Sequence, residues 1–154
     1  MIKRIDITDI ESAQEVLSIQ IAAYKIEAEI IGSYDLPPLK ETVETLRHCR
    51  ETFFGYYMKG RLYGVISIHI DSDVIEVCRL VVHPILFKKG VAQALLNFIE
   101  GENKFRKLKV STAIKNTPAI NFYKKNRFQL VNQKRVSEQI TLAFFEKNTK
   151  EIDE

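Results

Sequence analysis

The segment covering residues 74–99 restricts the fold more than any other part of this sequence. Residues 74–83 are apolar enough for a long strand, which ends at Pro84. The proline also holds the residue before it, His83, extended. A turn with two lysines and a glycine follows, and the apolar residues after it recur on one face of a helix. This order of strand, basic turn and helix is the strongest basis for a functional prediction.

The start of that helix has the features of an anion site. Backbone N–H groups of residues 88–92 open the predicted helix without acceptors, and the helix dipole adds partial positive charge there. Gly90 and Ala92 carry almost no side chain, so a pyrophosphate can approach the backbone. Taken alone, however, a Gly-x-Ala turn is more typical of an ordinary strand-to-helix connection.

The N-terminal part of the chain predicts one long amphipathic helix. Thr8 and Glu11 have the spacing of a capping box, and Gly32 is the expected stop. Between them, apolar residues recur every three or four positions, which predicts one buried face. That face is expected to consist of Ile10, Ala13, Leu17, Ile21, Tyr24, Ala28 and Ile31.

The rest of the chain alternates strands with short helices. Lys59-Gly60 separates two runs of strand-forming residues, which predicts a β-hairpin, and Thr117-Pro118 is a strong helix start. In chain order we expect a helix over 8–32, a helix over 39–49, strands over 52–58, 62–70 and 74–83, a helix over 91–101, a strand over 108–113, a helix over 117–125 and strands over 128–131 and 139–145.

The composition fits a single domain over residues 1–154, with a polar and frayed tail at 146–154. The sequence contains 45% hydrophobic and 28% charged residues, which excludes collagen-like, low-complexity and disordered chains. No apolar stretch approaches the roughly 18 residues of a membrane span, so we expect a cytoplasmic protein without a membrane partner. Cys49 and Cys78 lack the spacing of a metal site and are expected to be buried thiols, and no metal is expected.

Charge is distributed unevenly along the sequence. Residues 1–48 contain five basic and nine acidic side chains, whereas residues 85–135 contain twelve basic and two acidic ones. A basic segment suits a polyanionic ligand such as a phosphorylated cofactor or a nucleic acid, and an acidic segment suits a cationic substrate. The same asymmetry is also common on solvated surfaces.

Two motifs carry a family resemblance, and the first is the strand, turn and helix described above. Residues 76–84 and 88–96 resemble the coenzyme A site of the GNAT superfamily of acyl-CoA-dependent N-acyltransferases, whose loop motif is R/Q-x-x-G-x-G/A. Gly90 and Ala92 match this motif. Phe87 occupies its leading Arg/Gln position, so a neighbouring lysine is the expected substitute for that contact.

The second motif, residues 116–128, resembles the family signature N-x-x-A-x-x-F-Y-x-K-x-G-F, with Arg127 in place of the glycine. The resemblance implies a single-domain α/β fold whose mixed, mostly antiparallel sheet is flanked by helices and splayed between strands 74–83 and 108–113. It also implies that acetyl-CoA binds in this splay as the acyl donor. The residues so implied in binding are Leu80, Val81, Val82, Lys88, Lys89, Gly90, Val91, Ala92 and Asn116.

The resemblance assigns catalytic roles to two side chains. Tyr123 would point its hydroxyl at the thioester sulfur, where a phenol with a pKa of about 10 can protonate the departing thiolate. Taken alone, an aromatic residue at this position is more often part of the core. Glu76 resembles the strand glutamate of the family's histone-acetylating branch and would help to deprotonate the amine; it is otherwise a solvated residue near a strand end. Alternation places Glu76 on the strand face of Leu80 and Val82.

The acceptor is expected to be a primary amine that attacks acetyl-CoA directly. In this family the first two helices and their loop line the acceptor pocket, and acidic residues there either attract a cationic amine or lie on the surface. These residues are Glu27, Glu29, Asp35, Glu41 and Glu44.

The sequence is compatible with two other functions. One is a non-catalytic acyl-CoA-binding regulatory domain, because Phe87 and Arg127 depart from the family pattern. The other is a nucleic-acid-binding module that uses the basic run 104–109, although no recognised nucleic-acid motif accompanies that run. A homodimer is compatible with the sequence, which does not fix the oligomeric state.

Overall fold

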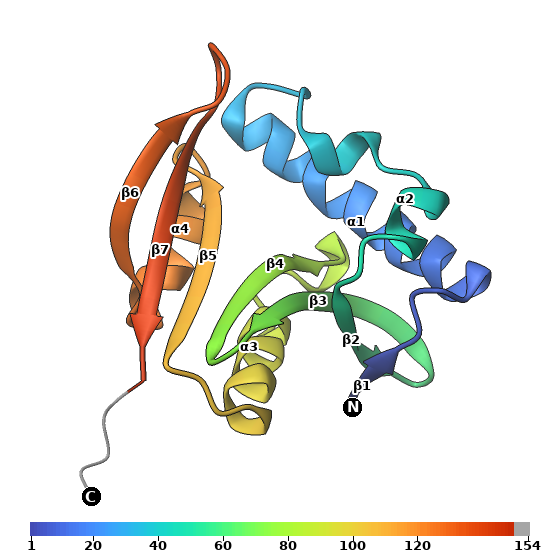
Figure 1. The fold of residues 1–154 in the computed structure, drawn as a ribbon. Coiled ribbons are helices and arrows are strands. Elements are labelled where there is room, and N and C mark those ends of the chain that lie inside the picture. Colours follow the sequence, from blue (N-terminus) through green and yellow to red (C-terminus); the bar gives the residue numbers. More distant parts are fainter. Residues whose placement is uncertain (150–154) are drawn as a thin grey trace, which may run out of the picture.

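One seven-stranded sheet organises residues 1–149, the part of the chain that the computed structural model describes (Figure 1). The strand order is β1-β2-β3-β4-β5-β7-β6, and only the β4–β5 pair is parallel, so the predicted mixed and mostly antiparallel sheet is confirmed. The strands are β1 (Ile2–Ile5), β2 (Thr52–Met58), β3 (Arg61–Asp71), β4 (Val74–Val82), β5 (Lys107–Ala113), β6 (Gln129–Arg135) and β7 (Thr141–Asn148).

Helices cover both faces of this sheet. The helices are α1 (Ile10–Ile31), α2 (Val43–Arg47), α3 (Val91–Glu102) and α4 (Thr117–Lys125), with 3₁₀ turns η1 (Pro37–Lys40) and η2 (Pro84–Leu86). Residues of α3 and α4 share one buried cluster with Val77 and Val82 of β4. Val81 lies in a second cluster with residues of α1 and α2, so these two helices cover the opposite face.

The sheet opens between β4 and β5. The two strands pair only from Val74 opposite Lys107 to Val77 opposite Val110. Beyond those four pairs β4 continues to Val82 and β5 to Ala113 without contacting each other in the ladder. The predicted splay is therefore confirmed, and Figure 1 shows β5 diverging from β4 beneath α1.

The long first helix begins and packs differently from the prediction. Its N-cap is Asp9, whose carboxylate accepts a hydrogen bond from the Ser12 N–H at 3.0 Å, while the Thr8 hydroxyl donates to Asp6 instead. Ile10 is 50% exposed, because the buried face is rotated from the predicted one. The buried residues of α1 are Ala13, Val16, Ile19, Gln20, Ala28 and Ile31.

Other boundaries differ because side chains outside the predicted segments supply caps and ladder partners. The predicted helix over 39–49 is η1 followed by the short α2, which begins after the capping residue Thr42. The N-cap of α4 is Asn116 rather than Thr117. The tail predicted to begin at 146 is wrong for residues 146–148, which belong to β7 and pair with β5, whereas residues 150–154 lie outside the described residues.

Candidate active site

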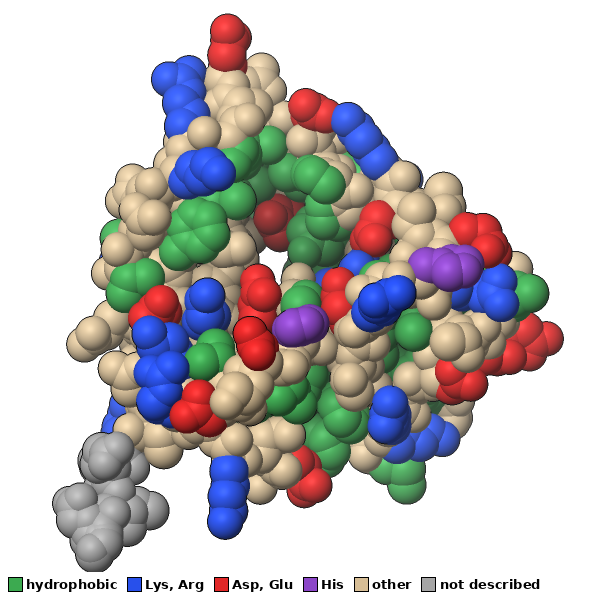
Figure 2. All heavy atoms as spheres, viewed as in Figure 1, with side chains coloured by type: hydrophobic (Ala, Val, Ile, Leu, Met, Phe, Trp, Pro, Cys, Tyr) green, Lys and Arg blue, Asp and Glu red, His purple; other side chains and the backbone are tan. Residues whose placement is uncertain are grey.

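A cavity of about 540 Å³ occupies the opening between β4 and β5. In the view of Figure 2 the molecule is hollowed at this place, with acidic side chains at the edge and apolar ones along the wall. The lining residues are Tyr24 and Glu27 of α1, residues 35–38 of the following loop, 77–80 of β4, 110–113 of β5, Asn116, Ala119 and Tyr123 at α4, and Val136, Ser137, Ile140 and Leu142 of the β6–β7 hairpin. Segments far apart in the sequence thus converge on one hollow.

A β-bulge at Cys78 shapes the β4 wall of the cavity. Val77 pairs with Ile68 and Arg79 with the adjacent Ser67, so Cys78 is the extra residue. A bulge reverses the alternation of side chains along a strand.

The bulge corrects the face predicted for Glu76. The alternation that placed it with Leu80 and Val82 does not hold across the extra residue: Val77 packs in the same cluster as these two side chains. Glu76, next to Val77, therefore lies on the opposite face, where Arg79 and α1 meet. Its side chain is exposed and does not line the cavity.

Tyr123 lies at the cavity wall on α4 and is only 6% exposed. The rings of Phe128 and Phe145 hold it, with centroids at 5.4 and 6.0 Å. Within residues 1–149 the Tyr123 hydroxyl has no hydrogen-bond partner. Every fully buried side-chain polar atom in these residues has one, so the hydroxyl is not fully buried and opens to the cavity that Tyr123 lines. Burial, and then the nearby Glu27, raise the pKa of Tyr123, which keeps the phenol protonated and able to donate.

Glu27 is the cavity-lining acid that the sequence did not single out from its acidic neighbours. Burial raises its pKa to about 7, although a hydrogen bond from the Asn116 side chain acts in the opposite direction. Among the described residues no Lys, Arg or His lies within 4 Å of its carboxylate. The group therefore changes charge near neutral pH inside the cavity.

The spacing of α1 contains a signal for Glu27. Gln20 is completely buried, and Glu27 follows it by seven residues, or about two helical turns, on the same face as Ala13. Polar residues at core positions are uncommon unless they are hydrogen-bonded or functional. The pattern can be recognised only when the buried face of α1 is known, and that face is rotated from the predicted one.

Arg79 also lines the cavity, but its charge is already engaged. Its guanidinium forms ion pairs with Glu41 and with Glu51, the latter at 2.8 Å, and donates to Gln20 Oε1 at 2.9 Å. Gln20 Nε2 in turn donates to Glu41 at 2.7 Å and to the Pro38 carbonyl at 2.9 Å. This network ties β4 to α1 and to the loop that forms the cavity rim.

Two further groups in the cavity are neutral near pH 7. Burial, followed by the charge of Glu27, raises the pKa of the Tyr24 phenol. Burial, followed by Glu51 and Glu76, raises the pKa of the Cys78 thiol to about 12. Neither group supplies an anion, and Asp35 at the rim is paired with Lys40.

The residues predicted to bind the cofactor fall into two groups. Leu80 lines the cavity, whereas Val81 and Val82 are buried just beyond it at the end of β4. Residues 88–90 are exposed at the start of α3, where Lys88 and Gly90 have φ of 62° and 85°. Within residues 1–149 no acceptor is found for the N–H groups of the first α3 turn, 91–93, so an anion can still bind there.

Asn116 connects the end of β5 to the cavity. It is 7% exposed and lines the hollow, and its Oδ1 accepts the Ala119 N–H at 3.3 Å as the cap of α4. The amide nitrogen remains available to donate to Glu27. The structure thus brings Asn116, Tyr123 and Glu27 together.

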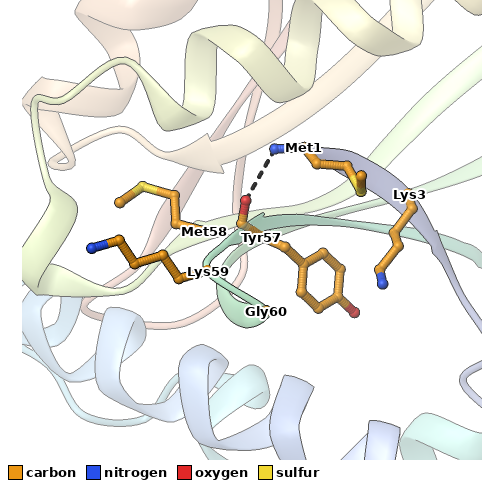
Figure 3. Close-up of a pocket in the computed structure, with 6 residues that line it drawn as sticks. All are labelled: Met1, Lys3, Tyr57, Met58, Lys59 and Gly60. Carbon is orange, nitrogen blue, oxygen red and sulfur yellow. Dashed lines mark hydrogen bonds between the residues drawn. The ribbon is translucent and has the colours of Figure 1, made fainter.

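A second hollow, of about 610 Å³, lies at the β2–β3 turn and is lined by Met1, Lys3 and 57–60 (Figure 3). The Met1 amino group donates to the Tyr57 carbonyl at 3.0 Å, and Lys3 Nζ lies 4.6 Å from the Tyr57 ring centroid. This hollow contains no carboxylate, thiol or imidazole, and its titratable groups are the Tyr57 phenol, the Met1 amino group and two lysines. Among the described residues no group of three or more His, Cys, Asp or Glu side chains could hold a metal ion, and no helix is long and apolar enough to cross a membrane.

A protein-family model described as the acetyltransferase (GNAT) family matches residues 13–128, which include the splayed strands, the α3 turn and the α4 motif. The chain belongs to the GNAT acetyltransferase family. UPF0157 protein YqkA of Bacillus subtilis (strain 168) is 40% identical over 134 residues, covering 86% of this chain and 39% of that protein. This GNAT chain therefore spans about two fifths of the length of that relative.

Solved structures share the fold at low sequence identity. The ribosomal-protein-S18-alanine N-acetyltransferase of Escherichia coli matches with a TM-score of 0.78 and 14% identity, covering 100% of this chain and 96% of that one. The PaiA N-acetyltransferase of Thermoplasma acidophilum, solved in complex with coenzyme A, has a TM-score of 0.76 and 17% identity, covering 97% and 99%. These likenesses confirm the GNAT fold and leave the acceptor open.

Proposed function

We propose that this GNAT domain transfers an acetyl group from acetyl-CoA to a primary amine by direct attack. The observation that carries the proposal is the hydroxyl of Tyr123, which opens into the cavity where β4 and β5 separate. The Tyr123 side chain is 6% exposed and packs against the rings of Phe128 and Phe145, which restrict the position of its hydroxyl.

The coenzyme is proposed to lie with its pyrophosphate at the start of α3 and its pantetheine arm in the splay. Free N–H groups at 91–93, with Lys88 and Lys89 beside them, supply positive charge for the pyrophosphate. The edge of β4 that faces the splay is unpaired at 80–82, so its backbone can bond to the arm. This use of coenzyme A is supported by the complexes solved for PaiA and for an aminoglycoside 6'-N-acetyltransferase.

The reaction needs one acid and a route for the amine's protons. The neutral amine nitrogen bonds to the acetyl carbon, the carbon–sulfur bond breaks, and its electron pair leaves on sulfur. The sulfur takes the hydroxyl proton of Tyr123, and the phenolate is reprotonated by the proton that the acylated nitrogen releases. The first proton of the starting ammonium goes to a base and then to water. The sequence predicts Glu76 as a relay for that step, but its exposed side chain lies outside the cavity.

An acetyl-CoA thiol-release assay against a panel of primary amines tests this function. Amine-dependent release, with formation of the N-acetyl product by mass spectrometry, is expected. Calorimetric binding of acetyl-CoA without any amine-dependent release would favour a regulatory acyl-CoA-binding domain instead. No acetyl-CoA binding at all would reject both.

A further inference from the structure

The two carboxylates that line the cavity differ in their surroundings. Asp35 is exposed at the rim and forms an ion pair with Lys40. Glu27 lies deeper, close enough to Tyr123 and Tyr24 to raise the pKa of both phenols. Within residues 1–149 it has no basic partner, so an ionised Glu27 is a buried charge that a cation from outside can compensate.

The wall beside Glu27 is apolar. Leu36 and Ile140 are each 5% exposed and pack together with Ala28 and Ile31 of α1. Pro37, Pro38, Val136 and Leu142 extend this wall toward the cavity mouth. A ligand here meets one negative charge surrounded by hydrocarbon, which is the usual composition of a small-molecule site.

We propose that Glu27 binds the acceptor's ammonium group and takes its first proton, and that the acceptor is a small monoamine whose single positive charge stands next to an apolar group. The catalytic part rests on the acetyl transfer proposed above, whereas the binding part does not. A polyamine would leave its other charges against the apolar wall without partners, at a large desolvation cost. A free amino acid would bring its own carboxylate toward Glu27.

The charges around Glu27 are consistent with this role. On α4 and α1 the facing groups are the neutral phenols of Tyr123 and Tyr24, and on β4 they are the neutral Cys78 thiol and Arg79, whose charge is engaged by Glu41 and Glu51. At the rim, Asp35 is paired with Lys40. With a pKa of about 7, Glu27 can hold an ammonium as carboxylate, accept its proton and release that proton to water.

Binding to the protein–coenzyme A complex tests the assignment without requiring turnover. At pH 8, titration calorimetry with 2-phenylethylamine is expected to show a Kd raised roughly 10- to 100-fold in Glu27→Gln. Glu29→Gln is the matched control, because it removes an exposed carboxylate from the same helix and should leave the Kd unchanged. Equal affinity of the Glu27→Gln variant and the parent, both verified as folded by circular dichroism, would overturn the assignment.

Turnover tests the acceptor class. With acetyl-CoA saturating, kcat/KM for 2-phenylethylamine is expected to exceed that for spermidine, phenylalanine and a Phe-Ala-Ala tripeptide by about tenfold or more. If kcat/KM for spermidine or for the tripeptide equals that for 2-phenylethylamine, the assignment of a small monoamine as acceptor is overturned. If no amine is acetylated while Glu27-dependent binding persists, the transfer proposal and the proton-accepting role fail but the ammonium site stands.

Discussion

At the scale of single residues, Glu27 is a group whose placement costs stability. Its pKa is about 7 in the folded protein and 4.5 when unperturbed, so the folded state favours the protonated acid. The free energy of unfolding is therefore highest below pH 4.5, where Glu27 is protonated in both states, and it falls as pH rises through 7. This fall amounts to about 3 kcal/mol.

We therefore expect Glu27→Gln to be more stable than the parent at pH 8, by up to about 3 kcal/mol, and nearly equal to it at pH 4. The reason is that glutamine resembles the protonated acid in shape and has no charge to bury. Urea denaturation at both pH values measures the difference. A variant less stable than the parent at pH 8 would show that the ionised carboxylate has a stabilising partner.

Tyr123 is expected to act on rate rather than on affinity. Tyr123→Phe removes only the hydroxyl that opens to the cavity, so turnover should fall about 10²- to 10⁴-fold while the Kd for acetyl-CoA hardly changes. Tyr63→Phe, a comparable change outside the cavity on β3, serves as the control. An unchanged rate, with chemistry shown to be limiting, would leave Tyr123 as a core residue only.

The proton relay predicted for Glu76 has a different signature. If Glu76 relays a proton, Glu76→Gln should slow acetylation most near neutral pH and recover as pH approaches the amine's own pKa, because hydroxide then takes over the task. The pH–rate profiles of parent and variant measure this. A uniform offset across the whole range would instead assign Glu76 to holding the strand or the substrate.

The sequence identified Tyr123 because a motif surrounds it, and it passed over Glu27 because none does. Glu27 owes its chemistry to α4 and β4, which meet α1 only in the folded chain. The strand face of Glu76 was wrong for a related reason: the extra residue at Cys78 reverses the alternation, and nothing local in the sequence marks it. Motif residues are predictable, whereas groups assembled by distant elements are not.

At the scale of elements, the C-terminal end of α4 holds Tyr123 in place. The Phe128 N–H donates to the Tyr123 carbonyl and the Arg127 N–H to the Lys124 carbonyl, both at 3.0 Å, which is the pattern of a Schellman motif. The rings of Tyr123 and Phe128 make its apolar contact. Arg127 consequently has φ of 72°, a left-handed conformation that suits glycine.

This geometry explains why the family signature has glycine where this chain has arginine. Arg127→Gly is expected to stabilise the protein by about 1 kcal/mol, because the side chain is exposed and the strain of a non-glycine residue is removed. Lys124→Gly, one turn earlier in the right-handed helix, should destabilise it by up to about 1 kcal/mol. Urea midpoints measure both, and a destabilised Arg127→Gly variant would contradict the explanation.

The order of elements was predictable because their periodicity and turns are local. The hairpin is an example: Lys59 and Gly60 have φ of 52° and 75°, the two-residue turn that matches strand twist. Boundaries were less predictable where caps compete, as at Asp9 and Asn116, each next to the residue with the expected signal. The last two strands are longer than their apolar pattern because β5 supplies ladder partners for β7 up to Asn148, and β7 supplies them for β6 up to Arg135.

At the scale of the whole molecule, the sheet consists of two parts that share few hydrogen bonds. Strands β1–β4 form one ladder and β5–β7 the other, and only four residue pairs between β4 and β5 connect them. The proposed coenzyme would occupy the opening and contact both parts. Ligand binding should therefore be visible in the stability of the entire fold.

We expect coenzyme A at 100 times its Kd to raise the free energy of unfolding by about 2.7 kcal/mol. Gly90→Glu should abolish the effect, because a carboxylate would stand against the pyrophosphate at the start of α3. Gly90→Ala is the matched control: no atom lies within 4 Å of an added Cβ and both variants share the strain of φ 85°, but alanine adds no charge. Differential scanning fluorimetry with and without coenzyme A measures the three proteins. Stabilisation of Gly90→Glu equal to that of Gly90→Ala would move the coenzyme site away from α3.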